Sequence, residues 1–168
     1  MTKSVIKHSR LTPCLCFEND AQEAAKFYTS IFKNSKITHI NHYGKMTAKA
    51  TGMPEGSILA VTFELDGQEF LAINGPAFKF TEAVSLIVYC KDQKEIDHYW
   101  SRLSAGGDKR SQVCGWLKDK YGVSWQVVPA AMGRMMKGKD GAKFDRALAA
   151  LNTMKKIDLK TLEEAYKG

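Results

Sequence analysis

The sequence has few cysteines and no long apolar segment. The first argues against a disulfide-rich secreted protein, and the second argues against a membrane-spanning one. Its four cysteines, Cys14, Cys16, Cys90 and Cys114, show no CxxC spacing and fall short of the density of a secreted disulfide scaffold, so we expect free thiols. No apolar run approaches the roughly 20 residues that span a bilayer, and the first residues are polar and basic, unlike a signal peptide. We therefore predict a soluble, cytoplasmic protein without a membrane partner.

Clusters that combine basic and aromatic residues are also absent, although the chain of 168 residues carries a net charge of +7. The positive charge is spread along the chain, and no basic run alternates with aromatic residues as a stacking surface for nucleic acid requires. We therefore favour a solvated basic surface and predict no nucleic-acid partner. No nucleophile paired with a base and no carboxylate dyad stands out, so the sequence leaves any catalytic residues unknown.

What is present is organised around residues 114–129, CGWLKDKYGVSWQVVP, which have the pattern of a β-hairpin. Two runs rich in Trp and Val flank a turn in which Asp119 can bond its own backbone and Gly122 can take a positive φ. Alternation along the second run places Trp125 and Gln126 on opposite faces. Gln126 is therefore expected on the face that a curved sheet could turn toward a cavity.

A pattern of strand, helix and further strands occurs twice. Each copy has an Asp-led helix, in which Asp20 or Asp92 precedes a Glu by three residues as in a capping box. Sliding the chain by 72 residues places Asp20 on Asp92 and Leu15 on Ile87, which indicates an internal repeat. The predicted strands are 11–17, 37–43, 57–65 and 68–74 in the first copy, with a loop at 44–56, and 85–89 plus the hairpin in the second.

A tail with helical periodicity follows residue 129. The segment 142–154 places apolar residues on one helical face, and Asp158 can cap a last helix with a similar stripe. Such stripes favour packing within the protein. The alternative, a helix that docks on a specific partner, stays open.

Several segments together resemble the PhnB-like branch of the vicinal oxygen chelate superfamily, which includes glyoxalase and bleomycin-resistance proteins. That branch is also called the 3-demethylubiquinone-9 3-methyltransferase domain family. The segments are LTPCLCFENDAQEAAKFYTSIF, FLAINGP, VSLIVYCKDQKEIDHYW, CGWLKDKYGVSWQVVP and LNTMKKIDLKTLEEA. The resemblance implies an α+β fold of two paired βαβββ modules with a C-terminal helical extension, and a homodimer. We accordingly expect one domain over 1–168, with modules at 11–76 and 84–129 and a helical tail at 130–168.

In the metal-using members of the superfamily, His or Glu side chains near the sheet centre hold a divalent ion. Carried over to this sequence, the ligand positions fall on Pro13, Ser85, Leu71 and Gln126. None of these is a good ligand for Zn, Fe or Mn, so we expect no metal and no other cofactor. A shift of register would instead offer the donors Asn74, Cys14 and Glu64.

The polar residues expected to line a ligand cavity are Asn74, Ser85 and Gln126, with Trp116 as an apolar wall. Pockets typically combine apolar walls with a few convergent polar groups, and this set fits that description. The alternative is that these groups only form hydrogen bonds within the sheets. Glu82, in the crossover before the second copy, could pair with a surface lysine or reach the cavity mouth, and the sequence does not decide between the two.

Other residue pairs carry weaker signals. His39 and His42 lie three residues apart on one predicted strand and so face opposite sides, which argues against a joint metal site. Cys14 and Cys16 share a face and could form a thiolate pair, but small core residues on a buried strand are the preferred interpretation.

These observations predict a small-molecule binding protein or a metal-independent enzyme of unassigned substrate. The alternatives are a metal-dependent lyase or dioxygenase of the vicinal oxygen chelate type, and sequestration of a drug or metabolite without turnover. Methyl transfer is not expected. The common S-adenosylmethionine-dependent class uses a doubly wound sheet whose first turn is rich in glycine, and this sequence has no such cluster after a strand.

Overall fold

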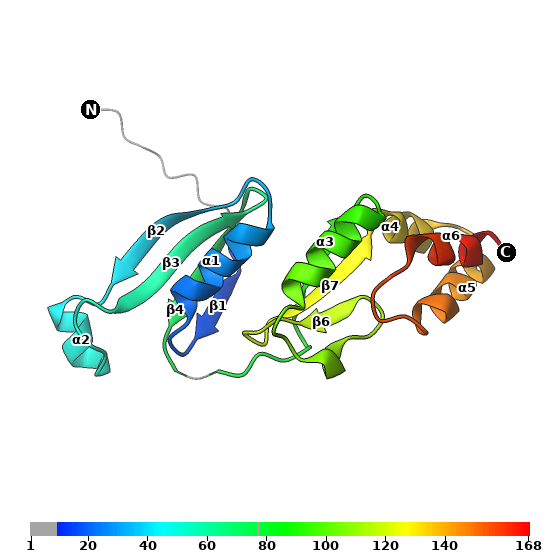
Figure 1. The fold of residues 1–168 in the computed structure, drawn as a ribbon. Coiled ribbons are helices and arrows are strands. Elements are labelled where there is room, and N and C mark those ends of the chain that lie inside the picture. Colours follow the sequence, from blue (N-terminus) through cyan, green and yellow to red (C-terminus); the bar gives the residue numbers. More distant parts are fainter. Residues whose placement is uncertain (1–9, 77) are drawn as a thin grey trace, which may run out of the picture. The chain divides into compact units, whose positions relative to one another are not determined.

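The structure, a computed structural model, describes residues 10–76 and 78–168 and confirms the α+β fold class (Figure 1). Its contacts divide the chain into two compact units, Met1–Phe78 and Lys79–Gly168. No helix in the described ranges is both long and apolar enough to cross a membrane.

The first unit is a four-stranded sheet with one main helix. Its elements are β1 (Cys14–Phe17), α1 (Ala21–Ile31), β2 (Lys36–His42), α2 (Lys45–Thr51), β3 (Ile58–Leu65) and β4 (Gln68–Asn74). The strand order is β1-β4-β3-β2; β1 runs parallel to β4, and the other pairs are antiparallel. Pro13 immediately precedes edge strand β1, where its missing N–H removes no bond from a central ladder.

The core of this unit lies between α1 and the sheet. Alanines on the buried face of α1, including Ala24 and Ala25, allow the helix to approach the strands closely because they have almost no side chain. The ring of Tyr28 stacks on Phe63 at 6.2 Å between centroids, and Phe63 stacks on Phe70 at 5.4 Å. The helical spacing predicted for α1 therefore corresponds to its packing.

The N-terminus of α1 differs from the prediction. Asp20 occupies the N-cap position, but its side chain forms no capping hydrogen bond. The backbone N–H of Ala21 instead donates to Asn74 Oδ1 at 2.9 Å. The predicted capping box is wrong here because Asn74, distant in sequence but adjacent in the fold, supplies the acceptor.

The segment predicted as a loop at 44–56 contains helix α2. Its residues include Met46, Ala48 and Lys49, which favour helix. Gly52 then ends the helix in the left-handed region, at φ +76°, and donates its N–H to the carbonyl of Ala48. The glycines at 44, 52 and 56 suggested a loop, but two of them flank a helix.

The second unit combines a three-stranded sheet with five helical segments. Its elements are β5 (Leu86–Cys90), α3 (Gln93–Leu103), the 3-10 helix η1 (Lys109–Ser111), β6 (Trp116–Lys118), β7 (Ser124–Pro129), α4 (Ala130–Lys137), α5 (Gly141–Leu151) and α6 (Leu159–Lys167). The strand order is β5-β7-β6, with β5 parallel and β6 antiparallel to β7. This unit, described throughout, has no strand corresponding to β2; η1 and a bridge between Val113 and Trp116 fill that part of the chain.

The two main helices follow the predicted repeat. Helices α1 and α3 begin 72 residues apart, at Ala21 and Gln93. At α3 Asp92 caps the helix as predicted, because its side chain accepts from the N–H of Glu95 at 2.9 Å. The Glu95 carboxylate in turn accepts from the N–H of Lys91, one residue before the N-cap.

The strands before these helices are offset by one residue from that alignment. Leu15 was aligned with Ile87, yet Leu15 is buried and Ile87 is 46% exposed. Val88, the next residue, is the buried counterpart. The alignment is wrong for the strands because the connection from strand to helix is one residue shorter in the second unit, and a one-residue slip exchanges the faces of a strand.

The hydrogen-bond ladders agree with this offset. Cys14 lies opposite Leu71 in the first sheet, and Ile87 lies opposite Gln126 in the second. Leu71 and Gln126 each follow their turn glycine by four residues. The structural counterpart of Pro13 is therefore Leu86, and Ser85 lies just before β5.

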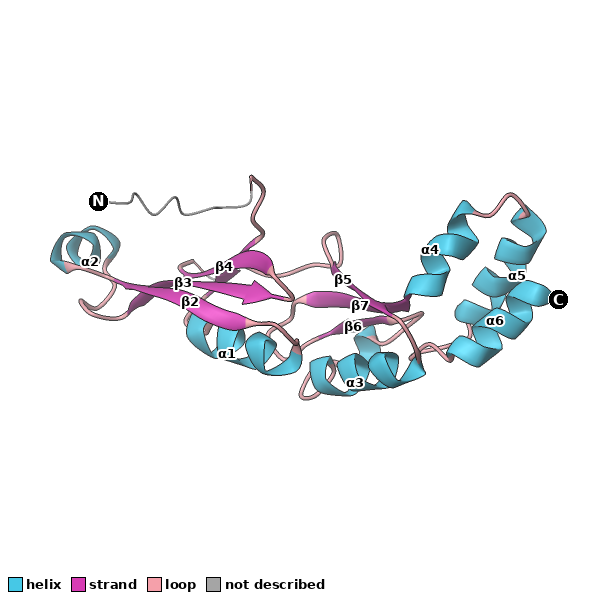
Figure 2. Cartoon of the chain, turned by 90° about the horizontal axis from the view of Figure 1, so that it is seen from above, coloured by secondary structure: helices cyan, strands magenta, loops and turns pink. Residues whose placement is uncertain are grey.

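The C-terminal tail forms a small helical cluster on the second unit (Figure 2). Helix α4 lies within the predicted helical tail but is additional to the two helices predicted there, at 142–154 and after Asp158. The apolar side chains of the three helices pack on one another and on the loop before α6, which confirms packing within the protein for these stripes. The buried members of this cluster are Ala131, Met132, Met135, Ala147, Ile157 and Leu162.

Candidate functional site

The predicted hairpin is formed by β6, β7 and the turn between them. Asp119 is 2% exposed and organises that turn, because its Oδ1 accepts from the N–H groups of Tyr121 (2.9 Å) and Val123 (3.0 Å). Its Oδ2 accepts from the indole Nε1–H of Trp125 at 2.8 Å. Gly122 adopts φ +84°, as predicted for the reversal. The turn therefore sets the positions of both strands and of one indole.

Alternation along the hairpin separates two faces. Trp125 and Leu117, opposite each other in the ladder, are buried on the face that carries α3. We call the other side, turned away from α3, the open face of the second sheet. On it, Trp116 lies opposite Gln126 and Lys118 lies opposite Ser124. Directly opposed residues have Cβ atoms about 5 Å apart, so these are two neighbouring side-chain pairs.

Three of the four residues expected to line a cavity come together on this open face. Gln126 Nε2 donates to Ser85 Oγ at 2.8 Å, and Trp116 is the cross-strand neighbour of Gln126. The hydrogen bond joins the residue before β5 to the centre of β7. It satisfies one hydrogen-bonding group on each side chain and leaves others free to contact a ligand.

Asn74 has a different environment, in the first unit. Its Oδ1 accepts from the N–H of Ala21, and its Nδ2 donates to the carbonyl of Ile58 at 3.0 Å. Its own carbonyl accepts from the hydroxyl of Tyr43 at 3.2 Å. Asn74 is 7% exposed, and its amide ties the end of β4 to α1 and β3.

A cleft of about 450 Å³ lies beside the hairpin in the second unit. Its size falls within the range of small-molecule pockets. Among the four predicted residues, only Trp116 lines it. Its lining residues are Glu82, Arg110, Ser111, Val113, Cys114, Trp116, Leu117, Lys118 and Ser124.

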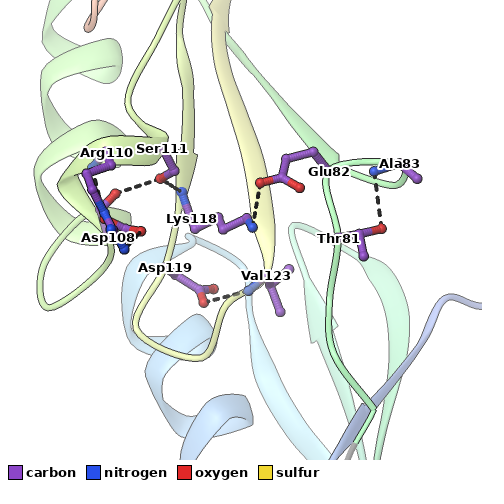
Figure 3. Close-up of polar contacts among 9 residues, drawn as sticks. All are labelled: Thr81, Glu82, Ala83, Asp108, Arg110, Ser111, Lys118, Asp119 and Val123. Atoms are coloured by element: carbon purple, nitrogen blue, oxygen red, sulfur yellow. Dashed lines mark hydrogen bonds and ion pairs between the residues drawn. The ribbon is translucent and has the colours of Figure 1, made fainter.

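An ion pair crosses the cleft between the crossover segment and β6. Lys118 Nζ lies 2.5 Å from Glu82 Oε1 (Figure 3). This hydrogen bond from Lys118 lowers the pKa of Glu82 below its ordinary value. The sequence left two alternatives for Glu82, an ion pair with a lysine or a place at the cavity mouth. In the structure Glu82 has both, because it pairs with Lys118 and lines the cleft.

The base of Lys118 is held by a second set of contacts. Its backbone N–H donates to Ser111 Oγ at 2.7 Å, and the Ser111 hydroxyl donates to the carbonyl of Asp108 at 2.6 Å (Figure 3). Arg110 forms two hydrogen bonds with Asp108, of 3.1 Å and 3.0 Å. These hydrogen bonds lower the pKa of Asp108. Arg110 is therefore neutralised beside the cleft, and the chain around Lys118 is well defined.

Ser124 is the unusual polar residue of the site. It is 2% exposed, and its Oγ makes no hydrogen bond with any residue that the structure describes. Buried hydroxyls generally have a partner, so an unpaired one beside a cleft indicates a group that a ligand can satisfy. Lys118 and Ser124 were not among the predicted site residues. The sequence could have indicated them, because Lys118 lies two residues after Trp116 and Ser124 lies two residues before Gln126. Each therefore shares a strand face with a predicted site residue.

The four positions that the family resemblance predicts as metal ligands do not suit a divalent ion. Leu71 has no donor atom, and the Gln126 amide is engaged with Ser85. The offset of the strands changes the first-strand positions to Pro13 and Leu86, which have no side-chain donors either. Among residues 10–76 and 78–168, no group of three or more His, Cys, Asp or Glu side chains could hold a metal. The donor set therefore does not fit a divalent metal ion.

The cysteines are free thiols in the structure, as predicted. Cys14 is exposed, so it is not the small core residue that we preferred, but burial of its thiol and the nearby Cys16 raise its pKa. Burial, with the charges of Glu95 and Asp92, raises the pKa of Cys90 to about 12. Neither Cys14 nor Cys90 is therefore activated as a nucleophile. Cys114 lines the cleft, and its Sγ lies 3.6 Å from Asn152 Oδ1.

The chain is similar to a known protein family and to several solved structures. A family model described as 3-demethylubiquinone-9 3-methyltransferase matches residues 9–128. Among solved structures, the PhnB protein of Bacillus cereus is 39% identical with a TM-score of 0.61, and the match covers 73% of this chain and 100% of that one. No curated protein shows a significant match.

More distant structures share the fold. Protein PA1353 from Pseudomonas aeruginosa is 16% identical with a TM-score of 0.56, over 73% of this chain and 98% of that chain. The fosfomycin resistance protein FosX from Listeria monocytogenes is 14% identical with a TM-score of 0.53, over 80% of this chain and 99% of that chain.

Proposed function

The chain belongs to the PhnB-like 3-demethylubiquinone-9 3-methyltransferase family, within the vicinal oxygen chelate superfamily, and from this premise we propose that it binds a small organic molecule at its second sheet. One observation carries the proposal. The open face of β6 and β7 places Trp116 and an unpaired, buried Ser124 hydroxyl at a cleft of about 450 Å³. An apolar wall with few polar groups is the usual composition of a small-molecule site.

Ser85 and Gln126 extend this site along the open face. Their mutual hydrogen bond holds the Gln126 amide beside Trp116, where it can contact a polar atom of the ligand. For Asn74 we propose a structural role within the first unit, because both ends of its amide bond to backbone groups there. The proposed binding needs no metal ion, since the donors at the family's metal positions are poor.

Methyl transfer, which the family's name describes, is not part of the proposal. The second unit is a three-stranded sheet of order β5-β7-β6, unlike the doubly wound sheet of the common S-adenosylmethionine enzymes. Binding at this site is required both for turnover and for sequestration without turnover. A homodimer, which the resemblance implies, and a cytoplasmic location belong to the same proposal.

Native mass spectrometry of the purified protein tests the composition of the assembly. We expect a dimer that retains no stoichiometric divalent ion, and a retained organic adduct would supply the mass of a ligand. One divalent ion per subunit would contradict metal-free binding and favour the metal-dependent lyase or dioxygenase. A monomer would contradict only the proposed homodimer and would leave the proposed binding of a small molecule intact.

Nuclear magnetic resonance of the indole N–H groups tests the location of the site. The chain has three tryptophans, and Trp→Phe variants assign their signals. On addition of a binding compound, we expect the Trp116 signal to shift and the signal of Trp100, on α3, to stay unchanged, because α3 covers the other face of the sheet. A shift confined to Trp100 would place binding elsewhere and contradict the proposal.

A further inference from the structure

We propose that the ligand of the cleft is a small organic acid, with an apolar body and one carboxylate, which binds Lys118 and Ser124 by displacing Glu82. This inference rests on the proposed function and adds the chemical class of the ligand. It follows from the charges, the burial and the ladder positions of the residues that line the cleft.

Lys118 is the cation of the cleft that can form an ion pair with a ligand. Its side chain is 23% exposed, and its backbone is anchored in β6 through the bond to Ser111. Arg110 also lines the cleft, but its guanidinium is held by Asp108, two residues away, through two hydrogen bonds. The ion-pair partner of Lys118 is Glu82, from a segment distant along the chain.

Glu82 occupies the position that a ligand's carboxylate would take. Its side chain is 64% exposed, and it lies in the segment 79–85, which forms neither helix nor strand. Its short contact with Lys118 demonstrates that a carboxylate fits at this ammonium group. Because exposed ion pairs contribute little free energy, exchange of one carboxylate for another costs little.

Ser124 offers the incoming carboxylate a hydrogen-bond donor that Glu82 does not use. Lys118 and Ser124 are direct cross-strand neighbours on the open face, so one carboxylate can accept from both Nζ and Oγ. Within the described residues the Ser124 hydroxyl has no acceptor. A bound carboxylate therefore satisfies a buried donor, which favours the ligand over Glu82.

The rest of the lining determines the body of the ligand. Trp116 and Val113 are apolar members of this lining, whereas the side chain of Leu117 is buried on the face that carries α3. Because Asp108 neutralises Arg110, displacement of Glu82 leaves one uncompensated positive charge in the lining, that of Lys118, which matches one anionic group. A hydrophobic monocarboxylate meets both requirements.

The test compares matched acids and amides as probes. 4-Phenylbutyrate and hexanoate are titrated against 4-phenylbutyramide and hexanamide, at millimolar concentrations, with amide and indole shifts of the ¹⁵N-labelled full chain as readout. We expect at least one acid to shift Trp116 and Ser124 and to bind about tenfold more tightly than its amide, since charged hydrogen bonds are the stronger ones.

Conservative variants separate the roles of the three side chains. Lys118→Gln is expected to abolish the preference for acid, Ser124→Ala to weaken binding of the acid, and Glu82→Gln to strengthen it, since the internal competitor is removed. Lys94→Gln removes an exposed lysine on α3, and this control should leave the preference unchanged. Circular dichroism confirms that each variant is folded.

Each outcome has a distinct meaning. Equal binding of acid and amide at the cleft would overturn the inference and leave the proposed small-molecule site intact. Binding by neither probe pair would overturn both. Acid-induced shifts that avoid Trp116 and Ser124, or an unchanged acid affinity in Glu82→Gln, would overturn the displacement of Glu82 at this site.

Discussion

At the scale of single residues, Asp119 decides the geometry of the candidate site. One carboxylate satisfies two turn N–H groups and the indole of Trp125, so it couples the reversal of the chain to the packing of the sheet on α3. A substitution that removes the Asp119 carboxylate leaves these N–H donors without their acceptor. The open face that carries Lys118 and Ser124 depends on this turn.

We predict that Asp119→Ala lowers the free energy of unfolding by about 3 kcal/mol, because three hydrogen bonds to a buried carboxylate are lost. Urea unfolding followed by tryptophan fluorescence measures the change. Asp145→Ala, at an exposed position of α5, is the matched control and should change stability by less than about 0.5 kcal/mol. Similar losses in both variants would contradict the role assigned to Asp119.

At the scale of elements, the helical tail docks on the hairpin through the segment between α5 and α6. The N–H groups of Cys114 and Gly115 donate to the carbonyls of Met154 and Lys155, each at 2.8 Å. Gly115 adopts φ +85°, and a Cβ atom there would lie 2.9 Å from Ile157 Cδ1. This glycine is therefore required both by its backbone conformation and by the close approach of the tail.

Gly115→Ala should lower the free energy of unfolding by about 2–4 kcal/mol, the sum of the left-handed conformation and the overpacking against Ile157. Gly122→Ala separates the two causes, because Gly122 has a similar φ of +84° and nothing within 4 Å of the added Cβ. For that variant we expect about 1 kcal/mol.

Hydrogen exchange of the Cys114 and Gly115 amides reports on docking of the tail directly. Faster exchange in Gly115→Ala than in Gly122→Ala is expected. If the two variants lose the same stability and the same protection, contact with Ile157 contributes nothing and the tail is held by other contacts.

At the scale of the whole molecule, four acids of the second unit have lowered pKa values. Hydrogen bonds from Lys118, Lys156, Arg110 and Thr161 lower the pKa values of Glu82, Asp97, Asp108 and Asp158. All four belong to Lys79–Gly168. A carboxylate whose pKa is lower in the folded state stabilises the fold above its ordinary pKa, and this contribution is lost as the pH falls through the folded value.

We therefore predict that acid weakens Lys79–Gly168 before Met1–Phe78, as the pH falls below the ordinary values of 3.8 for Asp and 4.5 for Glu. All three tryptophans lie in the second unit, so their fluorescence reports on it alone. Hydrogen exchange of the amides in β3 and β4 reports on the first unit. Asp158→Asn should reduce the pH dependence of the tryptophan signal, and loss of the first unit at higher pH would contradict the prediction.

Much of this architecture was predictable because it depends on contacts close in sequence. The hairpin turn, the cap at Asp92 and the helical faces of α1 and α3 each follow from residues within a few positions of one another. For the same reason, alternation correctly placed Gln126 and Trp125 on opposite faces. The family resemblance extended these local patterns to two modules and a helical tail.

The sequence by itself therefore determined the fold class, the repeat of the helices and the poor donor set at the metal positions, since residue types and short spacings suffice for these. The tertiary structure alone decided that Asn74 caps α1, that the strands slip by one residue, and that Glu82 meets Lys118 beside an unpaired Ser124. These features join residues far apart in the chain. Their geometry depends on which strands pair and how closely helices approach, and local patterns do not contain that information.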